Sequence, residues 1–192
     1  KSTIEAVMIT DPDKRDMQHE DPILNLTSPL PCPKPRTDDP EGLAKEGDIE
    51  INKGKSGDYH TISAVWKGLP MLRDAAISGS LTAIGGYVSM VNTCVHQEYM
   101  GDPLQRPMAQ GSQEALLFTL VYDLRKGSQK GSCIEMLLNA KGPLSKEMFY
   151  SDDENAEETG GPCINDYRFS ILTPSEIEGV IAQAKTWRNC WD

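Results

Sequence analysis

The sequence predicts an α+β domain, in which a mostly antiparallel sheet of about five to seven strands carries a packed C-terminal helix and follows an extended N-terminal arm. Three observations predict this plan. Several short apolar runs between polar or glycine-containing turns are typical of strands. A capped amphipathic segment ends the chain, and seven of the 13 prolines fall in the first 57 residues. We therefore divide the chain into a Pro-rich arm at residues 1–46, extended or disordered, and a single domain at residues 47–192.

The arm combines prolines and charges with few aromatic residues, so it buries too little apolar surface to offset its ordering entropy. Pro29, Pro31, Pro33 and Pro35 alternate with other residues, which favours a polyproline II rod. Ligands of the PxxP class need prolines three residues apart, because this helix returns to one face every third residue. The pattern therefore predicts a spacer, and the alternative is an arm that binds a neighbouring subunit or partner through these prolines.

Six segments of the domain have strand-like patterns. Residues 48–52 (DIEIN) and 59–66 (YHTISAVW) alternate apolar and other side chains. Residues 80–95 are apolar on both faces and predict a central strand, with a bulge or bend at Gly85 and Gly86. Residues 114–126 and 133–140 predict a hairpin across residues 127–132, and residues 166–172 predict a last strand.

Two segments have helix signals. Residues 69–79 have Pro70 at a first-turn position and Gly79 at a stop position. At the C-terminus, Thr173 is an N-cap, Pro174 begins the first turn and Glu176 completes a capping box. The apolar stripe that follows predicts a helix packed on the sheet and consists of Ile177, Val180, Ile181, Ala184 and Trp187.

The net charge of −10 divides into −4 for residues 1–57, zero for 58–147 and −6 for 148–192. An acidic chain repels phosphate backbones and anionic lipid, which disfavours nucleic acid or a membrane as its main partner. The longest apolar run, residues 115–122, is far shorter than the ~20 residues of a membrane span, so we expect no transmembrane segment. Because the chain starts at Lys1 rather than methionine, we expect it to be trimmed, processed or part of a longer product.

The cysteines bear on the compartment. Their odd number and the lack of a CxxC pair favour a reducing intracellular compartment, with a secreted location as the alternative. Asn25, in the triplet Asn-Leu-Thr, is a candidate glycosylation site. The five cysteines are Cys32, Cys94, Cys133, Cys163 and Cys190.

Catalytic and metal chemistry find little support in the sequence. Cys94 and His96 are the one close Cys/His pair, but two residues apart on a strand their attachment points are nearly 7 Å apart. A nucleophile and its base must approach to about 3 Å, and His60 adds only one further metal ligand. No GxSxG, P-loop, HExxH, GxGxxG or EF-hand pattern occurs. We expect no metal and no cofactor, and Cys94, His96 and His60 are the site residues of the enzyme alternative.

Two charged segments are candidate regulatory or docking elements. Residues 150–163 are rich in acids and predict an exposed loop, in which Ser151 is a candidate phosphorylation site; partner docking or calcium are further alternatives. The basic loop of Arg125, Lys126 and Lys130 is an ordinary solvated loop or a surface for an acidic flank of a neighbouring copy.

These observations favour a non-enzymatic structural or interaction protein that assembles with itself or with a protein partner through its arm. Virion matrix or capsid proteins and adaptors share this plan. A small enzyme with a Cys/His site is one alternative. A secreted binding protein is another, and it is favoured if the cysteines pair.

Overall fold

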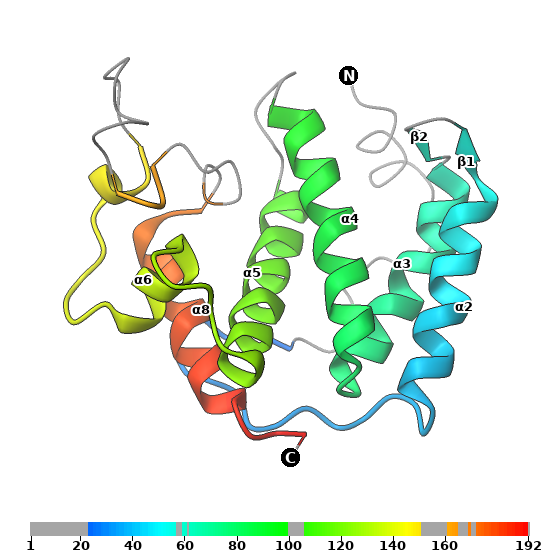
Figure 1. Ribbon diagram of the computed structural model, residues 1–192, viewed down its shortest axis with the longest axis horizontal. Helices are drawn as coiled ribbons and strands as arrows, with labels where there is room; N and C mark the ends of the chain where they lie inside the picture. Colours follow the sequence, from blue (N-terminus) through cyan, green and yellow to red (C-terminus); the bar gives the residue numbers. More distant parts are fainter. Residues whose placement is uncertain are drawn as a thin grey trace. The chain divides into compact units, whose positions relative to one another are not determined.

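The computed structural model describes residues 23–56, 59–60, 62–99, 106–150, 161–164, 169 and 172–191 of the 192-residue chain (Figure 1). This described part is mainly helical, with a short 3-10 helix and one pair of two-residue strands. In chain order the elements are α2 (Pro40–Lys53), β1 (Lys55–Ser56), β2 (Tyr59–His60), α3 (Ile62–Ile77), α4 (Leu81–Tyr99), α5 (Arg106–Lys126), α6 (Cys133–Asn139), η1 (Lys146–Met148) and α8 (Pro174–Trp187).

The predicted α+β fold with a sheet of five to seven strands is wrong. In the described residues, strands pair only where β1 meets β2 antiparallel, with Lys55 opposite His60 and Ser56 opposite Tyr59. The predicted strands at 48–52, 80–95, 114–126 and 133–140 lie in α2, α4, α5 and α6, and from Ile62 the segment 59–66 belongs to α3. Most of residues 166–172 lie outside the described residues.

The error has a physical reason. An apolar run without clear alternation does not distinguish a buried strand from a buried helix, and length decides between them. Helix α4 has 19 residues and α5 has 21, which is too long for ordinary strands. In α4, Ala83, Ile84, Tyr87 and Val91 are buried, and this spacing of one, three and four residues is helical.

The described chain divides into two compact units. Unit 1 contains Cys32–Pro103 and Cys190–Asp192, and unit 2 contains Ile23–Pro31 and Leu104–Asn189. The boundary expected at residue 46 falls inside α2, whose first residue is Pro40. The division into an arm and one domain stays a prediction.

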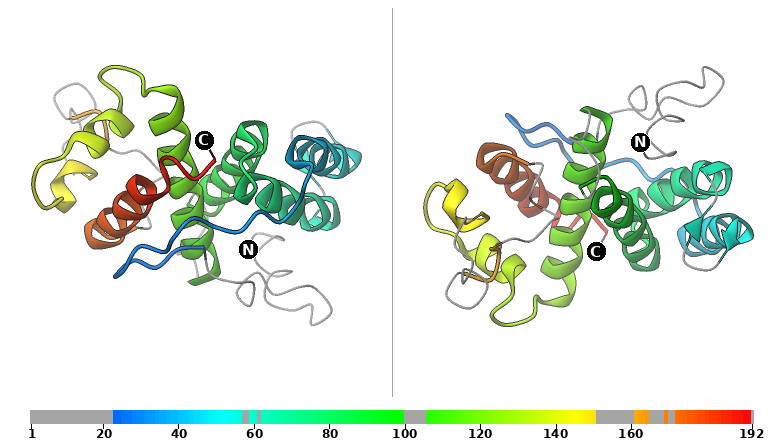
Figure 2. Two further views of the ribbon diagram at one scale, coloured as in Figure 1. Left: turned by 90° about the horizontal axis from the view of Figure 1, so that it is seen from below. Right: turned by 90° about the horizontal axis from the view of Figure 1, so that it is seen from above.

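Unit 1 is built on close contacts between α2, α3 and α4, which lie side by side in Figures 1 and 2. Helices α2 and α3 approach at two glycines: a Cβ at Gly68 would lie 2.5 Å from the carbonyl oxygen of Gly47. Gly86 of α4 faces Asp48 and Leu72, where a Cβ would be 3.3 Å from each. The Gly85-Gly86 pair, predicted as a strand bulge, is therefore part of a helix that packs closely.

The predicted helix at residues 69–79 is confirmed as the second half of α3, although Pro70 lies inside that helix rather than at its start. Gly79 has a φ of 100°. It ends α3 in a Schellman motif, in which the N–H of Ser80 donates to the carbonyl of Ala75 at 3.0 Å and that of Gly79 to Ala76 at 3.0 Å. The side chain of Ser80 then accepts from Ala83 N at 3.0 Å and begins α4.

In unit 2, α5 and α8 pack together and α6 contacts α5. The predicted terminal helix is confirmed as α8. Thr173 accepts a hydrogen bond from Glu176 N at 3.2 Å and donates its own N–H to the Glu176 carboxylate at 2.7 Å, which is the expected capping box. Every member of the predicted stripe is buried: Ile177, Val180, Ile181, Ala184 and Trp187.

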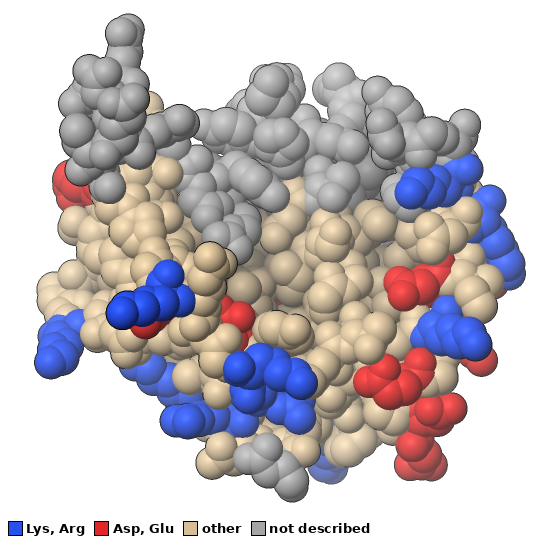
Figure 3. All heavy atoms as spheres, viewed as in Figure 1, with Lys and Arg blue, Asp and Glu red and all other residues tan. Residues whose placement is uncertain are grey.

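The described surface carries charges of both signs (Figure 3). On α2, for example, the exposed side chains include Glu41, Lys45, Glu46 and Lys53. Ile49, 47% exposed, lies among them as one of the few large apolar side chains open to solvent in the described part of the chain.

Candidate functional site

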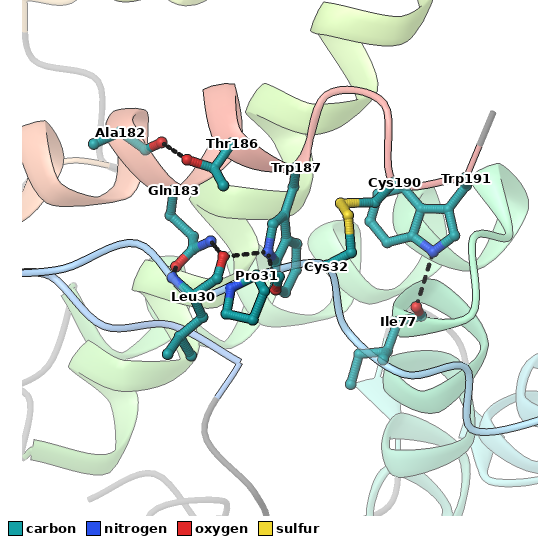
Figure 4. Close-up of a disulfide and its surroundings, with 10 residues drawn as sticks. All are labelled: Leu30, Pro31, Cys32, Ile77, Ala182, Gln183, Thr186, Trp187, Cys190 and Trp191. Atoms are coloured by element: carbon teal, nitrogen blue, oxygen red, sulfur yellow. Dashed lines mark hydrogen bonds between the residues drawn. A yellow bond between two sulfur atoms is a disulfide. The ribbon is translucent and has the colours of Figure 1, made fainter.

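A specific set of polar contacts in unit 2 joins the segment Ile23–Pro31, here called the strap, to helix α8 (Figure 4). The strap has neither helix nor strand and bends at residues 26–28. The side-chain amide of Gln183 pairs with the main chain of Leu30: its Oε1 accepts from Leu30 N at 2.7 Å, and its Nε2 donates to Leu30 O at 2.8 Å.

Trp187, one helical turn further along, completes this pairing. Its indole Nε1 donates to the carbonyl of Pro31 at 2.9 Å and to that of Leu30 at 3.2 Å. Gln183 is 0% exposed and Trp187 is 1% exposed. Polar atoms buried to this degree need partners, and the strap's main chain provides them.

The spacing of prolines matches these contacts. Proline has no N–H, so in the run Pro29-Leu30-Pro31 only Leu30 can donate a main-chain hydrogen bond. The side-chain oxygen of Gln183 accepts from that one N–H. The side-chain nitrogen of Gln183 donates to the carbonyl of Leu30, and the indole N–H of Trp187 donates to the carbonyl of Pro31. The alternating pattern that we interpreted as a stiff spacer thus suits a helix face with one acceptor and two donors.

A second contact brings main chain against main chain. A Cβ added at Gly179 of α8 would lie 2.6 Å from the carbonyl oxygen of Leu26, so only glycine allows the strap to come this close. Ile23 is buried, Leu26 and Leu30 are half-buried, and Asn25 and Pro29 are exposed. The strap therefore buries Ile23 and partly buries Leu26 and Leu30, while Asn25 and Pro29 face solvent.

Within unit 1, a disulfide joins Cys32, the residue after the strap, to Cys190, three residues after Trp187 (Figure 4). Their Cα atoms are 5.3 Å apart, the usual range for a disulfide. Cys32 is exposed and Cys190 is half-buried. Because 158 residues separate the two cysteines, the chain-entropy model assigns this crosslink about 5 kcal/mol of stabilisation.

Further contacts hold both flanks of this disulfide at the C-terminal end of α3. Trp191 donates its indole N–H to the carbonyl of Ile77 at 3.0 Å. The main-chain N–H groups of Arg36 and Thr37 donate to Ser78 Oγ at 2.7 and 3.2 Å. The bond from Trp191 satisfies a main-chain carbonyl that the end of α3 leaves without an intrahelical partner.

The second disulfide joins Cys133 to Cys163 in unit 2, with Cα atoms 4.7 Å apart. Cys133, the first residue of α6, is 4% exposed, and Cys163 is 0% exposed. This disulfide is therefore shielded from solvent, whereas Cys32 in the first one is open to it. The two pairs account for four of the five cysteines.

The other residues predicted as site residues lie elsewhere. Pro33 and Pro35 are in unit 1, between the strap and α2. Arg125 and Lys126 end α5, and Lys130 is exposed in the turn before α6. The basic loop thus joins two helices and is not the predicted hairpin loop. The hydrogen bonds of the strap described above go to Gln183 and Trp187 and not to these basic residues.

The predicted strand geometry, which argued against Cys94 and His96 as a nucleophile–base pair, is replaced by a helix. Cys94 and His96 belong to α4, and His60 belongs to β2, but their side chains lie outside the described residues, as do Ser151 and most of the acidic segment 150–163. Within the described ranges, no three His, Cys, Asp or Glu side chains are placed to share a metal ion. No helix there is both long enough and apolar enough to cross a membrane.

Sequence reasoning missed Gln183 and Gly179, the residues of α8 that hold the strap. A signal was present, since Gln183 interrupts the face between Val180 and Trp187, both of which are buried. A polar residue inside an apolar stripe needs a hydrogen-bond partner.

Comparison of the chain with protein families, curated proteins and solved structures gives no match.

Proposed function

We propose that this chain is a secreted interaction protein whose helix α8 binds a proline-containing, non-helical segment, and that the chain assembles with a second copy through that segment, the strap. The observation that carries this proposal is the pairing of Gln183 and Trp187 with the main chain of Leu30 and Pro31. Main-chain hydrogen bonds provide affinity in peptide recognition without requiring particular side chains.

The composition of the strap favours such a role. Prolines restrict the unbound segment, so less conformational entropy is lost when it binds. Along the main chain, the strap is connected to the rest of unit 2 only through residues 32–103. Exchange of a segment of this kind between identical chains is a route to dimers that needs no new contacts. The strap of a second copy would make the hydrogen bonds that the chain's own strap makes.

The disulfides support an oxidising compartment over the reducing one that the cysteine count favoured. Disulfides persist in secreted proteins and are rare in cytosolic ones. Four cysteines form two pairs whose Cα separations, 5.3 and 4.7 Å, lie in the normal range. A thiol assay on the native secreted chain should find one free thiol; five would contradict this location.

Complementary cysteine variants test strap exchange. A Cys32→Ser chain keeps Cys190, and a Cys190→Ser chain keeps Cys32, so neither can form this disulfide within itself. If the strap of the Cys190→Ser chain binds α8 of the Cys32→Ser chain, an interchain Cys32–Cys190 disulfide forms. Mixing the two, with peptide mapping of the covalent dimer, should show this heterodimer in excess over the homodimers that each variant forms alone.

A matched control separates exchange from random collision of thiols. Gln183→Ala in the Cys32→Ser chain removes the amide that pairs with the incoming Leu30, and should lower the heterodimer yield several-fold. Lys185→Ala changes an exposed residue of the same helix and should leave the yield unchanged. A heterodimer yield equal to the homodimer background, or unaffected by Gln183→Ala, would reject assembly through the strap.

A further inference from the structure

We propose that Asn25 carries an N-linked glycan. The triplet Asn25-Leu26-Thr27 is the one Asn-Xaa-Ser/Thr sequence in the 192 residues. A triplet of this kind does not indicate a glycan when its asparagine is buried. Asn25, however, is exposed on the strap. The inference rests on the proposed secreted location, because this modification takes place in the secretory pathway.

The geometry at the triplet brings its two functional residues together. The side-chain oxygen of Asn25 accepts hydrogen bonds from Thr27 Oγ1 at 2.9 Å and from Thr27 N at 3.0 Å, and a third from Ser28 N at 3.3 Å. This is an Asx turn, and it forms the bend of the strap at residues 26–28. The threonine hydroxyl that defines the triplet is therefore in contact with the amide that would be modified.

The amide nitrogen is left available by this arrangement. All three hydrogen bonds of the Asn25 side chain go to Oδ1, and within the described residues Nδ2 has no hydrogen-bond partner. A side-chain amide whose oxygen is held and whose nitrogen is open presents the atom to which a glycan is attached.

The surroundings accommodate a large substituent. Leu26, next in sequence, lies against Gly179 of α8, and Ile23 is 4% exposed. Asn25 and Thr27 instead face solvent. A glycan on Asn25 would thus extend away from unit 2, and the contacts of Gln183 with Leu30 would be kept.

The reaction requires a lipid-linked oligosaccharide and the transferase of the secretory pathway. Asn25 Nδ2 forms a bond to the anomeric carbon of the first sugar as the bond from that carbon to the pyrophosphate oxygen breaks. The lipid pyrophosphate leaves with the bonding electrons, and the proton lost by Nδ2 goes to a base of the transferase.

The experiment is secretion of the full chain from eukaryotic cells, followed by intact mass measurement before and after peptide N-glycosidase. The wild-type chain should carry one oligosaccharide that the enzyme removes, and the peptide containing residue 25 should then contain aspartate. Asn25→Gln and Thr27→Ala should abolish the added mass. Thr27→Ser keeps the hydroxyl and should retain the glycan, and so should Ser28→Ala, which changes the neighbouring residue outside the triplet.

The outcomes separate this inference from the proposed function. A secreted chain with one free thiol and no glycan would overturn glycosylation at Asn25 and leave the secreted location standing. Added mass that persists in Asn25→Gln would place the glycan elsewhere and also overturn the inference. A chain with five free thiols and no glycan would overturn both proposals.

Discussion

Gln183 forms two hydrogen bonds with the main chain of Leu30, a residue 153 positions earlier in the chain. A buried primary amide needs both a donor and an acceptor, and a single main-chain residue supplies both here. This relationship attaches the strap to α8 without depending on the identity of the leucine side chain. It also makes Gln183 the first residue at which the role of the strap can be tested.

Gln183→Ala should lower the free energy of unfolding by about 2–3 kcal/mol, because it removes two hydrogen bonds and leaves the N–H of Leu30 without its partner. The Leu30 carbonyl keeps the hydrogen bond from Trp187 Nε1. Chemical denaturation measures the effect. Lys185→Ala, at an exposed site of the same helix, should change stability by less than about 0.5 kcal/mol. Equal losses in the two variants would show that the strap contributes nothing specific through this amide.

Trp187 should show two separable contributions. Trp187→Phe keeps much of the apolar contact but loses the donor to Leu30 and Pro31, at a cost of about 1–2 kcal/mol. Trp187→Ala also leaves a cavity, since the ring is 1% exposed, and should cost about 3–5 kcal/mol. The denaturation midpoint of Trp187→Phe should therefore lie below that of the wild type, and the midpoint of Trp187→Ala should lie lower still. If Trp187→Phe were as stable as the wild type, the indole N–H would not matter for folding.

The approach of α2 to α3 should make Gly68 intolerant of a side chain. In Gly68→Ala the new Cβ would lie 2.5 Å from the carbonyl oxygen of Gly47, so the helices must separate, at about 1–3 kcal/mol. Gly85→Ala is the matched control, because nothing lies within 4 Å of a Cβ at that exposed helical position. Alanine there should stabilise α4 by about 0.5–1 kcal/mol. Thermal melts of the two variants measure these effects. A Gly68→Ala chain that melts above the wild type, with a Gly85→Ala chain that melts below it, would contradict this packing.

The two disulfides should differ in their rate of reduction. Cys32 is exposed and Cys190 is half-buried, whereas Cys133 and Cys163 are 4% and 0% exposed and are shielded from a small thiol in solution. Thiol–disulfide exchange depends on this access. With limiting reductant followed by alkylation, peptide mass analysis should find label on Cys32 and Cys190 first. Simultaneous labelling of all four cysteines would indicate that unit 2 opens as readily as the surface disulfide.

Glu50 should titrate below its ordinary range. A hydrogen bond from Lys53, one turn further along α2, lowers the pKa of the Glu50 carboxyl from 4.5. A carboxyl whose pKa is depressed by folding contributes stability above the unfolded pKa and loses it as the pH falls through the folded value. A carboxyl titration followed by NMR should place Glu50 below 4.5, and Lys53→Met should raise it. An unchanged pKa in Lys53→Met would exclude this ion pair as the cause.

Local signals in the sequence were sufficient where a few adjacent residues control the backbone. Thr173, Pro174 and Glu176 satisfy the first turn of α8 through their own side chains and fixed dihedrals, so the start of that helix is predictable. Gly79 is equally local, because a φ of 100° is accessible to glycine at little cost. Neither feature depends on what packs against it.

Helices α4 and α5 were mistaken for strands because apolar residues occur on several sides of each helix and hide, in the sequence, the alternation or the stripe that distinguishes the two structures. Tyr87 and Phe118 are both 0% exposed. Tyr87 belongs to a run rich in valine and threonine, residues that favour strands when considered alone. The run around Phe118 is rich in leucine and lacks alternation, so it does not distinguish a buried strand from a buried helix. Tertiary contacts override such preferences, which span only about 1 kcal/mol.

The sequence by itself determined the caps of α8, its buried stripe and the end of α3, since these depend on neighbours a few residues apart. Only the tertiary structure decided that Cys32 pairs with Cys190, that Gln183 binds Leu30 and that Gly68 meets Gly47. Each of these pairs joins positions whose separation along the chain carries no periodic signal, and the pairing follows from which surfaces the packed helices bring within a few ångströms.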